Sequence, residues 1–198
     1  MTQEDARLRA IGVTLVTDEE NPRVHAECMR IARRLRQHRA RIIGMLPASA
    51  DVAVPPIALQ LGLAFMELTG ATIAVVDANV RWPAFSSLVS GEPVTPDESL
   101  YATRWLRSSL AVLTPPHPGD AGAGLPELAR MLRGKMDLFA YVLVDLSGFD
   151  VLGEHLAAVD CVEGIIVVAS AGRTTSDQLL RLQRELPASR HLGVLLAG

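Results

Sequence analysis

The sequence predicts a single α/β domain in which a mostly parallel, doubly wound sheet carries helices on both faces. Short apolar runs rich in β-branched residues alternate with longer segments of helical spacing. The runs are apolar nearly throughout, which is typical of parallel strands buried on both faces. A chain of 198 residues with 49% apolar content has room for one domain with a sizeable core.

The apolar runs and the segments between them predict the individual elements. Strands are expected at 41–46, 72–77, 110–114, 139–145, 164–169 and 192–196. Helices are expected at about 23–38, 57–68, 126–133, about 152–159 and 175–186. Thr174 or Thr175 can cap the last helix. The stretches 89–99 and 115–124 are expected to be surface loops. We expect residues 1–20 to be an N-terminal extension and 21–198 to form the domain.

Composition and charge exclude several classes of protein. A net charge of −3 and a pI near 5.9 argue against general nucleic-acid binding, which needs a basic surface. No apolar run approaches the roughly 18 residues that span a bilayer, so no membrane span is expected. The first residues are polar and acidic, without a secretory pattern. We therefore expect a cytoplasmic protein, attached to a membrane at most through a partner.

The helix expected at 23–38 is strongly basic. It carries several arginines against one acid, Glu27, and arginine supplies all basic residues of the chain except Lys135. One interpretation is a solvated helix face. The other is a contact surface for an acidic partner, a neighbouring subunit or an anionic membrane. Charge alone leaves both open.

Five segments, in the same order along the chain, resemble the deviant-Walker P-loop ATPases, a superfamily that includes MinD-like and ParA-like proteins. The resemblance is strongest to the cytoplasmic domain of the bacterial tyrosine kinases that accompany capsule and exopolysaccharide export. The segments are Glu27-Cys-Met-Arg30-Ile-Ala-Arg33, Val76-Asp-Ala-Asn-Val-Arg-Trp-Pro83, the strand and turn at 138–149, the turn at 169–175, and 192–198.

The resemblance implies a P-loop NTPase-like fold and assigns roles to particular residues. Glu27, Arg30 and Arg33 correspond to a helix motif at a subunit interface. Asp77, Asn79 and Asp145 correspond to the acids that hold magnesium and assist catalysis, and Ala197 to an asparagine that contacts adenine. Two of these positions depart from the family, because Asn79 replaces an acid and Ala197 lacks an amide.

The phosphate-binding loop departs further. In the superfamily, glycine-supported backbone N–H groups, a lysine and the positive end of the next helix hold the phosphates. Counting back from the helix at 57–68 puts Ala53-Val54-Pro55-Pro56 over Gly-Lys-Ser/Thr-Thr. No glycine lies between Gly44 and Gly62, and proline has no N–H to donate. We expect a degenerate nucleotide site at Val54, Pro55 and Pro56, although the prolines can still begin a helix.

We therefore expect a catalytically inactive, kinase-like protein without a cofactor, acting through protein contacts in polysaccharide export or biosynthesis. Its partner would be an inner-membrane polysaccharide co-polymerase or a paralogous kinase, and self-association is a further expectation. One alternative is an ATPase or kinase that binds Mg-ATP unusually through Asp77 and Asp145, which are also the candidate metal ligands. Another is a MinD- or ParA-like positioning adaptor. For the two aspartates we favour a structural role at strand ends.

Overall fold

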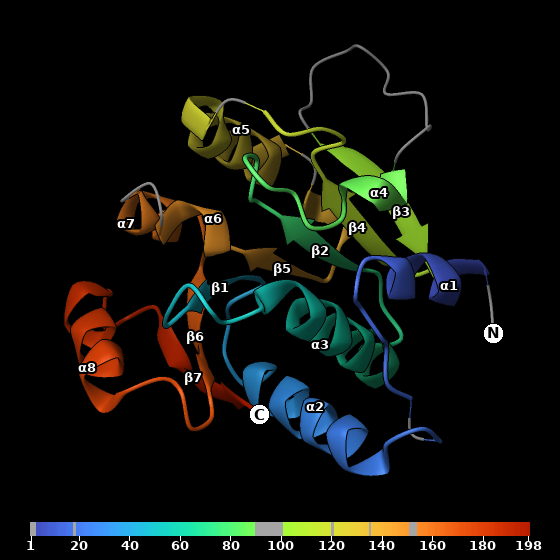
Figure 1. The fold of residues 1–198 in the computed structure, drawn as a ribbon, viewed down its shortest axis with the longest axis horizontal. Helices are drawn as coiled ribbons and strands as arrows, with labels where there is room; N and C mark the ends of the chain where they lie inside the picture. The colour runs from blue at the N-terminus through green and yellow to red at the C-terminus, as the bar shows by residue number, and fades with distance from the viewer. Residues whose placement is uncertain (1–2, 18, 90–100, 120, 135, 151–153) are drawn as a thin grey trace.

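The computed structural model describes residues 3–17, 19–89, 101–119, 121–134, 136–150 and 154–198. Within these ranges seven strands form one sheet in the order β3-β4-β2-β5-β1-β6-β7 (Figure 1). The strands are β1 Ile42–Pro47, β2 Ile73–Asp77, β3 Ala102–Leu106, β4 Leu110–Thr114, β5 Tyr141–Asp145, β6 Gly164–Ser170 and β7 His191–Ala197. All neighbours run parallel except β3 and β4. This confirms the predicted fold class.

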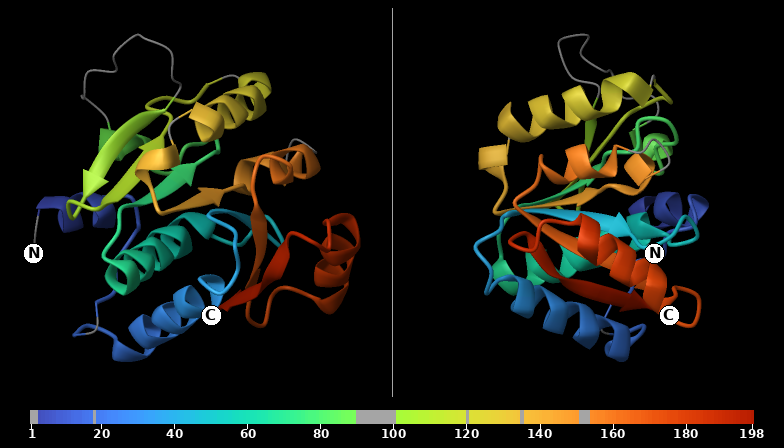
Figure 2. Two further views of the ribbon diagram at one scale, coloured as in Figure 1. Left: turned by 180° about the vertical axis from the view of Figure 1, so that it is seen from behind. Right: turned by 90° about the vertical axis from the view of Figure 1, so that its left-hand side faces the viewer.

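Helices cover both faces of the sheet. They are α1 Gln3–Ala10, α2 Pro22–Leu35, α3 Val54–Thr69, α4 Ser86–Val89, α5 Ala121–Gly134, α6 Ser147–Asp150, α7 His155–Val159 and α8 Ser176–Glu185, with a 3₁₀ turn at Met136–Leu138. One apolar cluster joins α1, α2 and α3 to the sheet, and a second joins α5, α7 and α8 to it. Figure 2 shows these two layers on opposite sides of the strands.

The sequence predicted six of the seven strands and the helices α2, α3, α5, α7 and α8, but not α1, α4, α6 or β3. The six expected strands are present, and Thr175 caps α8 through a capping box with Gln178. β3 was not expected, because its side chains alternate between half-buried and exposed instead of forming an apolar run. The loop expected at 115–124 is wrong at its end, since α5 begins at Ala121 and holds Pro126 inside it.

Two expected segments extend beyond the described part of the chain. Of the loop at 89–99, only Val89 is described, and it ends α4. Of the helix at about 152–159, residues 152 and 153 lie outside the described residues, and α7 occupies His155–Val159. Among the helices that the structure describes, none combines the length and the apolar character needed to cross a bilayer.

The described part of the N-terminal segment lies against α3. Leu8, Val13 and Leu15 are buried in the same apolar cluster as that helix. The side-chain amide of Gln60 holds the backbone of Val16 from both sides, accepting from Val16 N at 2.8 Å and donating to Val16 O at 2.7 Å. These contacts hold α3 in place. The first turn of α3 follows β1 and lies at the candidate site described below.

Candidate functional site

The carboxyl ends of the parallel strands bring most of the predicted site residues to one edge of the sheet. Asp77 ends β2 and Asp145 ends β5, the strand beside it, where the two residues are register partners. Val54, Pro55 and Pro56 form the first turn of α3, which follows β1 on the other side of β5. Ala197 ends β7, two strands further along. Ligands of doubly wound sheets bind at this edge.

Asp77 is completely buried and ties down the loop that follows its own strand. Its Oδ1 accepts from Asn79 N at 3.1 Å, and its Oδ2 accepts from Phe85 N and from Thr114 Oγ1, both at 3.1 Å. Burial raises the pKa of Asp77 to about 6, although these hydrogen bonds favour the charged form. Each carboxylate oxygen therefore has a protein partner, and the carboxylate acts as a clamp.

Asp145 differs from its neighbour because one of its oxygens is unsatisfied. Oδ1 accepts from Ser147 N at 2.9 Å, whereas Oδ2 is buried and has no hydrogen-bond partner. Burial, and then the nearby charge of Asp77, raise the pKa of Asp145 to about 7. A buried carboxylate oxygen without a donor is costly unless it is protonated or meets a ligand such as a cation.

Asn79 lies in the loop after β2, two residues beyond Asp77, and its side chain bonds to the backbone of that loop. Its Oδ1 accepts from Trp82 N at 3.0 Å and closes the turn after β2. It also lies so near Gly148 of α6 that a β carbon on that glycine would come within 2.7 Å of the Asn79 oxygen. The loops after β2 and β5 are therefore in direct contact, and the amide oxygen is already used within the protein.

The segment after β1 has the prolines and the helix start that the sequence predicted. α3 begins at Val54, after Ala53, without a side-chain cap. Of the four N–H groups that a helix leaves unpaired at its start, the two prolines remove those of the second and third positions. The side chain of Val54, over the expected lysine position, is fully buried in the core.

The loop that leads into α3 makes hydrogen bonds within itself and to β6. Ala48 N donates to Val168 O at 2.7 Å, and Val52 N donates to Ser49 O at 3.1 Å. The Ser49 hydroxyl donates to the Asp51 carboxylate, and this hydrogen bond lowers the pKa of Asp51. An exposed carboxylate held in its charged form thus lies beside the place where an anionic phosphate would have to enter.

The residues expected at an interface lie on α2. Glu27 pairs with Arg30 at 2.7 Å, and both side chains are exposed. Arg33 is exposed as well. Arg41, which belongs to the same basic stretch of sequence, has a structural task instead, because its guanidinium donates to Phe139 O at 2.8 Å and Ala140 O at 3.2 Å. The basic stretch therefore does not form one uninterrupted surface.

Ala197 does not meet the two aspartates. It lines a separate groove of about 750 Å³ together with Pro56, α2 and the rest of β7. No sequence pattern predicted this groove, because the groove depends on how α2 is placed over the edge of the sheet. Thr114 and Phe85 were also missed as partners of Asp77. The one sequence feature that could have indicated Thr114 is its place at the end of β4, the strand beside β2.

The donor set allows only an incomplete metal site. No group of three or more histidine, cysteine, aspartate or glutamate side chains within the described ranges is arranged to hold a metal. Asp145 Oδ2 and Asp77 could supply carboxylate oxygens to a hard cation such as Mg²⁺. The unsatisfied oxygen of Asp145 fits such an ion, whereas the fully occupied oxygens of Asp77 fit it less well.

Comparison with known proteins identifies the fold. No protein-family model matches the sequence. The chain is 25% identical over 174 residues to the succinoglycan biosynthesis transport protein ExoP of Rhizobium meliloti (strain 1021). That match covers 79% of this chain and 22% of the relative, so the chain spans about a fifth of that protein's length.

Solved kinase domains superpose on most of the chain. The BceF tyrosine kinase domain has a TM-score of 0.68 at 14% identity and covers 98% of this chain and 87% of its own. The kinase domain of the Escherichia coli tyrosine kinase ETK has a TM-score of 0.68 at 17% identity, covering 85% and 72%. The VpsO kinase domain has a TM-score of 0.64 at 16% identity, covering 91% and 98%. The chain thus has the fold of bacterial tyrosine kinase domains, as its sequence motifs suggested.

Proposed function

We propose that this chain is a catalytically inactive relative of bacterial tyrosine kinase domains that works through contacts with other proteins in the synthesis or export of a polysaccharide. The observation that carries the proposal is the first turn of α3. Pro55 and Pro56 cannot donate to a phosphate, and the side chain at the expected lysine position, Val54, is buried among apolar residues.

The missing donors can be converted into an approximate affinity. A hydrogen bond to a charged group contributes about 1.5–3 kcal/mol. Losing a lysine and two backbone donors removes about 4 kcal/mol or more, which is roughly a thousandfold in affinity. The charged Asp51 repels a phosphate on the same side, and the charge of Arg173, which also acts on Asp51, offsets part of this repulsion. Asn79 and Ala197 also lack the acid and the amide that the family uses at the metal and base ends of the site.

The functional context comes from the sequence relative. ExoP is described as a succinoglycan biosynthesis transport protein, and this chain matches about a fifth of it. A domain of this fold that has given up nucleotide could still occupy the position of a kinase in such an assembly. Its partner would be an inner-membrane polysaccharide co-polymerase or an active paralogue of the kinase. The exposed residues Glu27, Arg30 and Arg33 of α2 are the proposed contact.

Calorimetric titration with Mg-ATP tests the loss of nucleotide binding. We expect no saturable heat up to about 1 mM nucleotide, the affinity range in which binding contributes only about 4 kcal/mol. The matched control is an active bacterial tyrosine kinase domain titrated under the same conditions. A dissociation constant of micromolar order for this chain would show that the site still functions and would overturn the proposal.

One observation favours a second candidate, an ATPase or kinase with an unusual site. The unsatisfied, fully buried Oδ2 of Asp145 faces no donor, and Asp77 lies beside it on the next strand. In that case Mg²⁺ alone should raise the thermal midpoint of the protein, and Asp145→Asn should abolish the rise. If Mg²⁺ at millimolar concentration leaves the midpoint of the wild type unchanged, this candidate is excluded.

A further inference from the structure

The last strand of the sheet has an open edge without the usual protection. Among the described residues, β7 pairs only with β6. Residues 191–197 contain no proline, lysine, arginine or acid, although edge strands normally use such residues to prevent pairing with other chains. Val194 and Leu196 are 50% and 67% exposed on this strand. An uncharged, apolar edge of this kind is suited to accept another strand.

The orientation of β7 shows which groups a new strand would meet. Ala197 O accepts from Ala171 N on the β6 side at 2.6 Å. Because backbone polar groups alternate in direction along a strand, those of Leu196 and Val194 point outward. Leu195 packs against the apolar cluster of α2 and α3. The side chains of Val194 and Leu196 therefore point to the opposite face, the one on which α8 packs against β6.

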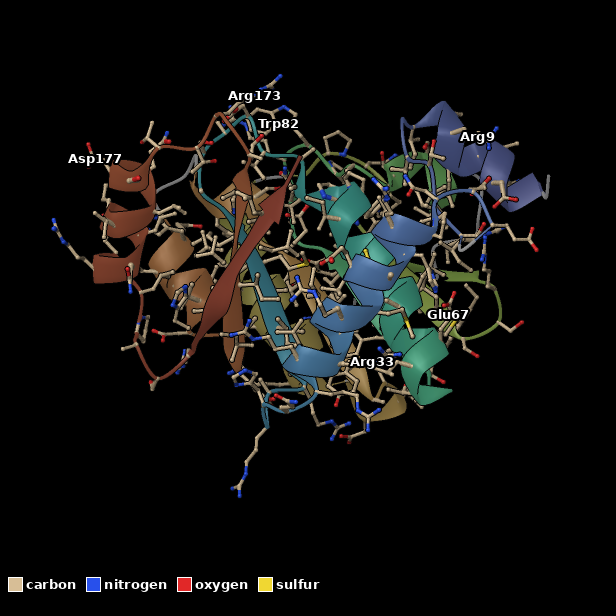
Figure 3. All side chains as sticks on the ribbon, turned by 90° about the horizontal axis from the view of Figure 1, so that it is seen from below. Arg9, Arg33, Glu67, Trp82, Arg173 and Asp177 are labelled. Atoms are coloured by element: carbon tan, nitrogen blue, oxygen red, sulfur yellow. The ribbon has the colours of Figure 1, made fainter. Side chains whose placement is uncertain are left out.

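A groove on the α2 side of β7 supplies charge beside this edge. Its volume is about 750 Å³, and it runs between α2, the start of α3 and β7. Figure 3 shows β7 in front, with α2 on one side of it and α8 on the other. On the α2 wall the groove is lined by Arg23, Glu27, Arg30 and Arg34, whereas Arg33 is not among its lining residues.

The charge of that wall decides between a second copy and another protein. If β7 paired antiparallel with its own copy around a twofold axis, both α2 helices would lie on the same face of the joined sheet. Arginine-rich walls would then face each other, with Glu27 already paired to Arg30. Like charges brought together in this way are destabilising. An acidic partner segment would instead place carboxylates beside the same arginines.

We propose that the open edge of β7 binds an extended segment of a partner protein in which apolar and acidic residues alternate. Its backbone would pair with the outward N–H and C=O groups of Val194 and Leu196. Its apolar side chains would cover those of the same two residues, and its carboxylates would reach Arg23, Arg30 and Arg34 across the groove. The inference rests on the protein-contact part of the proposed function and not on the loss of nucleotide binding.

The test uses a labelled synthetic peptide of alternating valine and glutamate and measures its binding by fluorescence anisotropy. We expect saturable binding to the wild-type chain and none for a peptide with lysine in place of glutamate. Arg34→Glu should weaken binding by about tenfold or more, because a close charge pair becomes a repulsion. Arg36→Glu is the matched control, with the same charge change two residues away at an exposed position outside the groove, and should change the affinity by less than about twofold.

A backbone variant separates strand pairing from a purely electrostatic contact. Leu196→Pro removes an outward N–H, and proline is tolerated at that side of an edge strand, so the circular dichroism spectrum should stay that of the wild type. The peptide should no longer bind. Should circular dichroism show that the proline variant is unfolded, protection of the Val194 and Leu196 amides from hydrogen exchange by the peptide takes its place.

Several results would overturn the proposal. These are no saturable binding by the wild type, equal weakening by Arg36→Glu and Arg34→Glu, or unchanged binding by a folded Leu196→Pro. A wild-type dimer in sedimentation that Leu196→Pro converts to a monomer would identify a second copy as the occupant. Tight binding of Mg-ATP would contradict the inactive site without affecting any of these readouts.

Discussion

The ends of β2 and β5 and the end of β1 lie on the same edge of the sheet but use their backbone in opposite ways. After β2, the N–H groups of Asn79 and Phe85 point at the carboxylate of Asp77. After β1, Ala48 N donates to Val168 O and Val52 N to Ser49 O, and the helix that follows has two prolines in its first turn. The first region directs backbone donors at a negative charge, whereas the second lacks two of the donors that a helix start normally offers to an anion.

This difference gives a structural reason for an aspartate at a strand end to be kept even in a protein that no longer binds a phosphate. Asp77 fixes the path of the chain from β2 to α4 and is bonded to Thr114 on the strand beside it. A residue with that task is retained for stability, whatever happens to catalysis. In the proposed inactive site, Val54 and the two prolines have structural tasks of their own, because Val54 is buried in the core and the prolines lie in the first turn of a helix. Acids at strand ends are therefore weak evidence of activity by themselves.

The largest expected effect comes from removing the clamp at Asp77. Asp77→Ala leaves the Phe85 N–H buried without an acceptor and the Thr114 hydroxyl with only a long contact to Pro115 O at 3.4 Å, and we expect a loss of about 3 kcal/mol or more in the free energy of unfolding. Urea denaturation measures it. Thr114→Val, which removes only one hydrogen bond, should cost about 1 kcal/mol. If both substitutions cost the same, Asp77 is not the organising group.

A dependence on pH is expected from the same pair. The pKa values of Asp77 and Asp145 are raised to about 6 and about 7, from an ordinary value of 3.8. The folded chain therefore holds more protons than the unfolded chain between about pH 4 and 7. Stability should be greatest at the acidic end of this window and should fall as pH rises through it.

Thermal unfolding at a series of pH values measures this effect. Asp145→Asn should flatten the dependence, because the more strongly perturbed of the two groups no longer titrates. A wild-type protein that is equally stable at pH 5 and pH 7.5 would mean that neither carboxyl group is desolvated as the structure shows.

The smallest effect is expected in the loop after β1. Ser49→Ala removes the hydroxyl that bonds the exposed Asp51, and surface changes of this kind alter stability by less than about 0.5 kcal/mol. Urea denaturation alongside the Asp77 variants gives a direct comparison of the two regions. A loss larger than about 1 kcal/mol would show that the loop is held as firmly as the strand ends.

The parallel core could be predicted from the sequence because burial on both faces leaves continuous apolar runs, as in β6. β3 could not, since an edge strand with one exposed face alternates Thr103, Arg104 and Trp105 in a pattern that also suits a loop. The start of α5 was missed because Pro126 suggested a first turn, whereas the helix begins at Ala121.

For the candidate site, the sequence predicted which residues come together but not the hydrogen bonds that they make. The strand ends predicted that Asp77 and Asp145 would lie together, and the prolines predicted a helix start. Which carboxylate oxygen has a partner depends on the path of the loops, as with Phe85 eight residues after Asp77. The groove beside β7 depends on the placement of α2, which no local pattern specifies.

The contact between Gly148 and Asn79 has a consequence for the history of this site. A β carbon at position 148 would come within 2.7 Å of the Asn79 side-chain oxygen and 3.0 Å of its Cα, so a larger residue fits at 148 only if the loop at Asn79 moves. Related sequences with the same two loops should therefore keep glycine at position 148, whatever residue stands at position 79. A larger residue there would mark a sequence in which the path of one of the two loops has changed.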